Sequence, residues 1–283
     1  MKFSAKRKIT DGAMYALMSM GLAGVIAALL FILVYVFSQS AGFLNLSLIT
    51  CPERGILPMI VTTLYVVLVS IAIALPVGVI TAIYLNEYSG GFGFARRLVR
   101  VMRLAIDTLA GIPSIIYGLF GLLFFSRMLG FGQSIIAGGL TLSIMILPVI
   151  IRTTEESLKS IPASVREGSL ALGATQFQTI VHVVLPPALP GIVTALILAI
   201  GRVIGESAPV LLTVGLARNL PRSVFESGRT LTVHLYQLTS EAVHEDDFGI
   251  AFATAATLIL LVMLINAATK IITIKFRKDA GGQ

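Results

Sequence analysis

Residues 166–190, REGSLALGATQFQTIVHVVLPPALP, form a semipolar stretch between two long apolar runs and decide how the rest of this chain is interpreted. Glycine is the residue best suited to the left-handed turn that ends a helix, and Gly173 lies where a first short helix would end. Thr175 and Gln178 have the spacing of a capping box, which opens a second helix. The segment therefore predicts two short helices that meet at a turn around Gly173.

The composition places this chain in a membrane. Of its 283 residues, 56% are hydrophobic and only 12% are charged, and the mean hydropathy is +0.94. A soluble domain carries about 25% charged residues, so these values exclude an ordinary soluble protein. The single cysteine, Cys51, cannot form an internal disulfide, and no Cys/His cluster is present in the sequence. The sequence thus predicts neither redox chemistry nor a metal site.

Six apolar runs are long enough to cross the membrane as helices, since about 20 residues span a hydrocarbon core of about 30 Å. They cover residues 13–37, 56–85, 104–129, 133–151, 188–215 and 250–273. We expect an all-α integral membrane protein with a single transmembrane domain, residues 1–283, in which a peripheral first helix precedes a core of residues 56–273. The first run exceeds the roughly 7 to 15 apolar residues of a signal peptide, which favours an uncleaved helix.

The basic residues predict the orientation, because lysine and arginine gather on the cytoplasmic side of a membrane. With both termini cytoplasmic, most of the 21 basic residues fall inside: Lys2, Lys6, Arg7, Lys8, Arg96, Arg97, Arg100, Arg103, Arg152, Lys159, Arg166, Lys270, Lys275, Arg277 and Lys278. The other side keeps Arg54, Arg127, Arg218, Arg222 and Arg229. The loop of residues 152–187 is therefore expected in the cytoplasm, and the net charge of +7 reflects topology and anionic lipid rather than nucleic acid.

The turn also carries a family resemblance. Glu167, Gly173, Leu185 and Pro186 lie at the spacing of the EAA loop of ABC importer permeases, with Gly168 the first of two small residues where that family usually has alanines. In that family the loop docks on a cytoplasmic ATPase. The resemblance implies an ATPase-coupling loop that contains Arg166, Glu167, Gly168, Gly173, Leu185 and Pro186.

Two charged residues, Arg202 and Glu206, interrupt the fifth apolar run. Four residues apart, they are expected on one face of a helix, with Arg202 about 20 Å beyond the predicted helix start. An unpaired charge at that depth is costly, so the two side chains either pair to fix the helix register or line a hydrated path. A guanidinium suits a tetrahedral oxyanion, whereas a carboxylate accepts a hydrogen bond only from a protonated oxygen. The pair therefore favours phosphate over sulfate.

Three further stretches narrow the resemblance: LAGIPSIIYGLFGLLFF at residues 109–125, LPVIIRTTEESL at residues 147–158 and GRVIGESAPVLLTVG at residues 201–215. They resemble PstA, one of the two permease families of phosphate-specific ABC importers, and with the EAA loop they cover most of the predicted core. The resemblance implies the transmembrane fold of a type I importer with a cytoplasmic coupling helix.

The resemblance also implies the substrate path and the partners. It puts Arg152, Arg202 and Glu206 on the path of phosphate, and Ser207, where the family often has threonine, keeps the hydroxyl. The implied partners are a second permease (PstC-like), two copies of a cytoplasmic ATPase (PstB-like) and an extracytoplasmic phosphate-binding protein (PstS-like). ATP and Mg²⁺ are expected on the ATPase, since this sequence has no Gly-x-x-x-x-Gly-Lys motif. We expect a permease in the cell membrane, not an enzyme, without a cofactor of its own.

Proline and glycine predict breaks and close contacts inside the runs. Gly111, Pro113 and Ser114 interrupt the third run, and the backbone groups freed there must face protein or a water-lined path. Gly118 and Gly121 follow on the same run and predict a close helix contact.

Other interpretations remain open from the sequence. Arg152 has the position of an arginine that anchors a helix end among lipid headgroups, and Asp107 is expected to pair with Arg103 one turn earlier. His244 begins a run of polar residues that favours a solvated loop over a metal site. The substrate could be another oxyanion, such as sulfate or molybdate. A secondary transporter would explain the spans and the charged pair, but not a loop with ATPase-docking spacing.

Overall fold

The computed structural model describes residues 2–50, 55–88, 93–241 and 245–280, and this part of the chain contains helices and no β-strand. Cys51, Arg54 and His244 lie outside the described residues. The long helices are α1 (Lys2–Ser40), α3 (Leu57–Glu87), α6 (Ile135–Lys159), α9 (Leu185–Gly205) and α12 (Glu245–Ala280). The shorter helices are α2 (Leu46–Thr50), α4 (Phe94–Gly111), α5 (Ser114–Gly121), α7 (Ala163–Ala171), α8 (Gln176–Thr179), α10 (Ala208–Thr213) and α11 (Leu231–Glu241), and the π-helical turns are η1 (Leu122–Met128) and η2 (Ile180–Val184).

Among the described residues, five helices are long and apolar enough to span a membrane, or six if one sharply bent pair counts as a single span. The span that contains α9 begins at Gln176, before the predicted start at residue 188, because η2 joins α8 to α9 into one helix that continues to Gly205. The span within α12 begins at Asp247, before the predicted start at residue 250. The prediction of an all-α membrane protein is confirmed.

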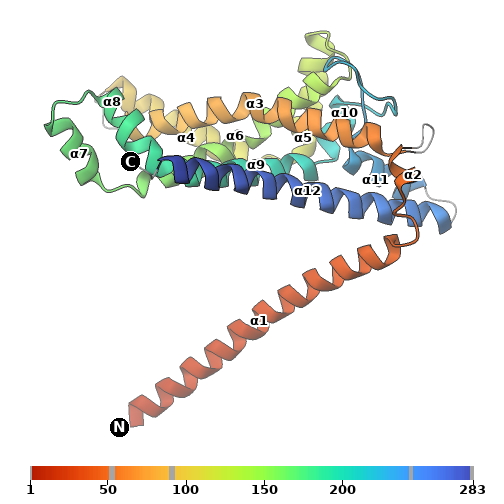
Figure 1. Ribbon diagram of the computed structural model, residues 1–283. Helices are drawn as coiled ribbons and strands as arrows, with labels where there is room; N and C mark the ends of the chain where they lie inside the picture. Colours follow the sequence, from red (N-terminus) through yellow and green to blue (C-terminus); the bar gives the residue numbers. More distant parts are fainter. Residues whose placement is uncertain (1, 51–54, 89–92, 242–244, 281–283) are drawn as a thin grey trace.

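The core lies where α3, α6 and α9 pack together (Figure 1). Leu142 and Ile146 of α6 are fully buried there. Close packing brings polar groups together as well: the hydroxyl of Ser143 donates to the carbonyl of Ser70 at 3.1 Å. The opposite faces of these helices carry exposed apolar side chains such as Leu68 and Leu198, as expected for surfaces that contact lipid.

The bundle has two distinct ends, with α7 and α8 at one and α10 and α11 at the other (Figure 1). Helices α6 and α9 run antiparallel between them. Near the α7–α8 end, the hydroxyl of Ser157 donates to the carbonyl of Ala188 at 3.0 Å. Near the α10–α11 end, the backbone N–H of Ser134 donates to the carbonyl of Thr213 at 2.9 Å. Helix α1 leaves the bundle at an angle (Figure 1).

The predicted third span, residues 104–129, is not a single straight helix. It is broken after Gly111, and the helices on either side are bent by 103°. Pro113 has no N–H to donate to the carbonyl of Leu109, which accepts instead from the N–H of Ile112 at 3.2 Å and from the hydroxyl of Tyr117 at 2.7 Å. The break predicted at Gly111 to Ser114 is therefore present, but it separates α4 from the span that follows.

The predicted fifth span, residues 188–215, is also wrong as a continuous helix. Helix α9 ends at Gly205, and Glu206 follows with extended backbone, ψ 129°. Pro209 stands in the first turn of α10, where its missing N–H costs nothing, so a new helix starts there. Glu206 consequently lies at a helix end rather than on a helical face.

The close contact predicted at Gly118 and Gly121 is confirmed. A Cβ atom at Gly118 would lie 2.8 Å from Cα of Pro209, and one at Gly121 would lie 2.8 Å from Cγ2 of Thr213. Only glycine lets α5 approach α10 this closely, which fixes the short helix α10 beside the span formed by α5 and η1.

Candidate functional site

The α7–α8 turn has the geometry that the sequence predicts. Gly173 adopts a left-handed backbone, φ 90°. The hydroxyl of Thr175 accepts from the N–H of Gln178 at 3.3 Å, and Oε1 of Gln178 accepts from the N–H of Thr175 at 2.9 Å, so both bonds of the capping box are formed. The turn leaves Leu172 91% exposed and Phe177 68% exposed. Two large apolar side chains thus project from a polar end of the molecule.

Arg166 of the predicted coupling loop points inward. Its guanidinium forms a salt bridge with Glu87, the last residue of α3, with Nη2 at 3.0 Å from Oε1, and the two side chains are 19% and 8% exposed. It also donates to the carbonyls of Leu158 and Ile161 at 2.8 and 2.7 Å. Its Nε hydrogen bonds to both carboxylate oxygens of Glu87. Arg166 therefore fixes α7 to the ends of α3 and α6.

The other residues of the predicted loop divide into two groups. Glu167, Gly168 and Gly173 are exposed on α7 and the turn. Leu185 and Pro186 instead form the first turn of α9, beyond η2. The structure therefore brings the first group together at the turn and places the second at the base of a spanning helix.

Arg152 lies on α6, and its Nη2 is 2.5 Å from Oδ1 of Asp107 on α4. The expected pairing of Asp107 with Arg103 is wrong, because Arg103 instead binds Glu155 at 2.7 Å. Lys159 binds the same carboxylate at 2.8 Å. Helix α4 is thus held against α6 by two ion pairs that join residues far apart in the sequence, and no local signal could have revealed them.

Arg202 and Glu206 meet at the end of α9. Nε of Arg202 lies 3.9 Å from Oε1 of Glu206, and the two side chains are 38% and 18% exposed. This distance is that of an ion pair without a close hydrogen bond. Gly201 and Gly205 beside them have open space where a Cβ atom would lie. The pair therefore stands on an uncrowded surface, with donor capacity left on the guanidinium.

The three residues expected on the substrate path do not form one cluster. From the contact between Ser157 and Ala188, antiparallel α6 and α9 place Arg152 and Arg202 at levels about nine residues, or roughly 14 Å, apart along the bundle. Arg202 and Glu206 lie toward the α10–α11 end. Arg152 lies nearer the α7–α8 end, with Asp107 as its partner.

Comparison with known proteins identifies the family. The model of the family described as "Binding-protein-dependent transport system inner membrane component" matches residues 74–278. The chain belongs to this family. It is therefore a multi-pass inner membrane subunit of a transport system, and the match includes α6, the α7–α8 turn and α9.

Two relatives illustrate the similarity within this transport family. The probable ABC transporter permease protein YqgI of Bacillus subtilis is 31% identical over an alignment of 283 positions, gaps included, which covers 93% of this chain and 95% of YqgI. The phosphate transport system permease protein PstA 1 of Mycobacterium tuberculosis is 40% identical over 205 residues, 72% of this chain and 66% of that protein. The chain thus spans about two thirds of the length of PstA 1.

Solved structures share the fold. The MetNI methionine ABC transporter, in an inward-facing conformation, aligns with a TM-score of 0.61 and 26% identity over 79% of this chain and 94% of the other. A bacterial alginate ABC transporter aligns with a TM-score of 0.66 and 18% identity over 92% of this chain and 95% of the other, which shows the fold alone. The chain has the all-helical fold of a type I ABC importer transmembrane subunit.

Sequence analysis of this family member missed several residues that shape the candidate site. Glu87 ends α3 and holds Arg166, Glu155 of α6 binds Arg103 of α4, and Thr232 donates to the carbonyls of Ile204 and Glu206. Only their charge or hydroxyl marks them in the sequence. Within the described residues, no group of three or more His, Cys, Asp or Glu side chains could hold a metal ion.

Proposed function

We propose that this chain is the permease subunit that forms half of the transmembrane path for inorganic phosphate in an ATP-driven importer. The observation that carries this proposal is the loosely paired Arg202 and Glu206 at the break between α9 and α10. Relatives named as phosphate transport permeases support the same substrate. In this proposal the chain alternates between access to the two sides, and Arg152 lies farther along the path.

The charged pair has the chemistry to select hydrogen phosphate. The guanidinium of Arg202 can donate to two oxygens of a tetrahedral anion, and the carboxylate of Glu206 can accept from the oxygen that still carries a proton. Sulfate at neutral pH has no such proton, so its oxygens would meet the carboxylate without a hydrogen bond. A polar group left without its partner in this way supports strong discrimination.

The α7–α8 turn is proposed to dock on a cytoplasmic ATPase. Leu172 and Phe177 project apolar surface that a groove of the ATPase could cover, and Glu167 offers a charge beside them. Such exposed apolar side chains at the tip of a polar loop are typical of an interaction site. The proposal puts this turn and both termini in the cytoplasm, in agreement with the distribution of basic residues.

The proposed assembly contains four kinds of subunit. This chain pairs with a second, related permease to complete the path, two copies of the ATPase supply the free energy of ATP hydrolysis, and an extracytoplasmic binding protein delivers phosphate at the α10–α11 end. ATP and Mg²⁺ belong to the ATPase, so this chain is proposed to be no enzyme itself. Solved ABC transporters with the same fold support this architecture.

The test is ATP-dependent uptake of radiolabelled phosphate by membrane vesicles that contain the assembled importer, with excess sulfate as competitor. Uptake should resist sulfate in the wild-type importer. In Glu206→Gln, which keeps the side-chain volume and supplies an amide donor to sulfate, sulfate should compete at least about tenfold better. An assembled complex that hydrolyses ATP but takes up sulfate or molybdate instead of phosphate would redirect the proposal to that oxyanion. Uptake driven by an ion gradient without ATP would overturn it in favour of a secondary transporter.

A further inference from the structure

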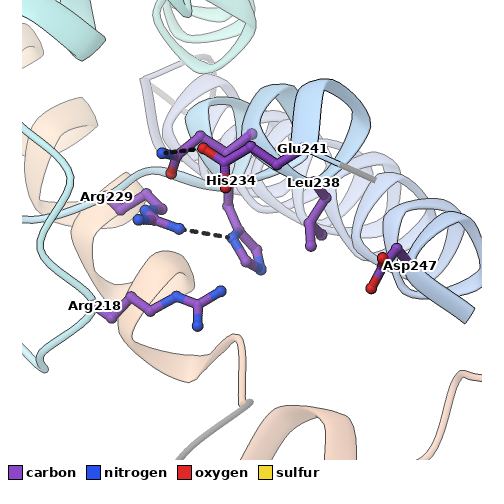
Figure 2. A pocket seen from close by; sticks show the side chains of 7 residues that line it. Arg218, Arg229, His234, Leu238, Glu241 and Asp247 are labelled. Carbon is purple, nitrogen blue, oxygen red and sulfur yellow. Dashed lines mark hydrogen bonds between the residues drawn. The ribbon is translucent and has the colours of Figure 1, made fainter. Parts of the chain in front are cut away.

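A polar pocket lies at the α10–α11 end (Figure 2), and neither Arg202 nor Glu206 lines it. Its volume is about 140 Å³, and it is lined by Arg218, Arg229, His234, Gln237, Leu238, Glu241 and Asp247. Both arginines come from the segment between α10 and α11, the next four residues come from α11, and Asp247 comes from α12. Since about 10–15 Å³ is enough for one water molecule, the pocket has room for a small tetrahedral anion.

The guanidinium of Arg229 is held in a fixed position without a carboxylate. Nε and Nη2 donate to the carbonyl of Leu216 at 3.1 and 2.9 Å. Within the described part of the chain, neither Arg229 nor the exposed Arg218 forms a salt bridge. Two positive charges therefore face one pocket, and the two carboxylates that also line it, those of Glu241 and Asp247, form no salt bridge with either arginine among the described residues.

His234 adds a third donor to the pocket. Its side chain is buried, and burial, then Arg229 and Arg218, lower its pKa to about 4, so the imidazole is neutral near pH 7. Nδ1 lies 3.4 Å from Nη1 of Arg229, a group that can only donate. Nδ1 must then accept, and Nε2 carries the proton. Figure 2 shows the imidazole and both guanidinium groups turned toward the same space.

The pocket also offers acceptors that a protonated anion could satisfy. Nε2 of Gln237 donates to Oε1 of Glu241 at 3.5 Å, which leaves the amide oxygen of Gln237 as the remaining polar atom. That oxygen is buried and has no hydrogen-bond partner. A buried acceptor without a donor is unfavourable, and an O–H group of a ligand would satisfy it. The side chains of Glu241 and Asp247 make the pocket unfavourable for an anion that has no proton to donate.

We propose that this pocket is a second phosphate-binding site, which receives hydrogen phosphate at the α10–α11 end before the ion reaches Arg202. Arg218, Arg229 and Nε2 of His234 donate to the anion, and Oε1 of Gln237 accepts from its O–H group. This inference rests on the proposed function and extends it to a site where phosphate enters.

A direct structural link joins the pocket to the charged pair. Thr232 lies in the first turn of α11, two residues before His234, and its hydroxyl contacts the carbonyls of Ile204 and Glu206 at 3.2 and 3.3 Å. These carbonyls belong to the end of α9, where Arg202 and Glu206 meet. The first turn of α11 therefore carries a pocket residue on one side and supports the charged pair on the other.

The experiment isolates the pocket by measuring equilibrium binding of radiolabelled inorganic phosphate to the purified importer, without its binding protein, in an Arg202→Gln background. Phosphate binding should persist there and weaken at least about tenfold when Arg218→Gln is added. Arg218 suits this test because its exposed side chain can be changed without disturbing packing. Arg222→Gln is the matched control, since Arg222 is an exposed arginine of the same segment that does not line the pocket. A second variant, Gln237→Leu, should let sulfate compete more effectively.

The outcomes separate this inference from the proposed function. Wild-type phosphate uptake together with equal phosphate binding in the Arg218→Gln and Arg222→Gln variants would overturn the pocket and leave the permease assignment intact. Unchanged phosphate binding with weaker attachment of the binding protein would also overturn it, because Arg218 would then contact that protein. Absence of phosphate uptake in the wild-type importer would instead refute the proposed function.

Discussion

Two arginine–glutamate pairs at opposite ends of this molecule are built from the same side chains and differ in almost every other respect. Arg166 and Glu87 are largely buried, lie 3.0 Å apart and are surrounded by further hydrogen bonds. Arg202 and Glu206 are more exposed and lie 3.9 Å apart. The first pair uses nearly all of its hydrogen-bonding capacity within the protein, whereas the second keeps capacity for another ion. The share of hydrogen-bonding capacity that is already used within the protein, more than residue type, distinguishes a structural pair from a candidate binding pair.

The strongest test of this comparison is Arg202→Gln. We expect phosphate uptake to fall about 100-fold, because the charge-assisted hydrogen bonds of a guanidinium to the anion are lost. The free energy of unfolding should change by less than about 1 kcal/mol, since this partly exposed pair has little net effect on stability. Uptake in vesicles and thermal unfolding of the purified importer measure the two effects. A large loss of stability with uptake preserved would show that this pair, too, is structural.

Glu87→Gln should reduce the free energy of unfolding more than Arg202→Gln does, and phosphate uptake less. Loss of the carboxylate leaves the buried guanidinium of Arg166 with only carbonyl partners, and the free energy of unfolding should fall by about 3 kcal/mol. Uptake should fall about tenfold, because the α7–α8 turn is less firmly attached to α3. The ratio of ATP hydrolysed to phosphate transported measures this loss. Glu156→Gln, an exposed substitution on α6, is the control and should leave that ratio unchanged.

The pocket that contains Arg218 and Arg229 adds a third group of arginines to this comparison, and the pH dependence of stability tests it. His234 has a pKa near 4 in the folded protein, below its ordinary value of 6.5, so its contribution to stability is present above about pH 6.5 and is lost as the pH falls toward 4. Arg218, Arg229, Glu241 and Asp247 face it in the pocket. Between about pH 7 and pH 5.5 the free energy of unfolding should fall by about 1 kcal/mol. The same titration of His234→Gln should lack this component, and an identical pH dependence would contradict the assignment.

Local signals predicted local structure well. The turn at Gly173, the capping box of Thr175 and Gln178, and the close contact at Gly118 each follow from residue types within a few positions, and the structure confirms them. The family, and with it the fold, could also be predicted from short stretches of sequence. Such features depend on backbone preferences that a sequence carries directly.

Two kinds of feature were not predicted from the sequence. The end of α9 at Gly205 lies inside a long run that is apolar except for Arg202 and Glu206, and that pair was expected on one continuous helical face, although Pro209 marked the start of a new helix. The pairs Arg166–Glu87 and Arg152–Asp107 join residues 79 and 45 positions apart. Pairing over such separations depends on how the helices pack, and one sequence does not specify it. The sequence therefore predicted the pairing of Arg202 with Glu206, four residues on, but not that of Arg152 with Asp107.

Helix α3 has one more consequence, because it is anchored at both ends. Glu87 at its last turn binds Arg166, and near its first turn the hydroxyl of Thr63 accepts from the N–H of Leu231 at 3.0 Å, at the start of α11. At 1.5 Å per residue these anchors lie about 36 Å apart. Treated as a rigid lever, the helix converts a tilt of about 5° at one end into a displacement of roughly 3 Å at the other. If α3 tilts in this way when the α7–α8 turn is pushed, the displacement would arrive at the first turn of α11, where Thr232 meets the end of α9.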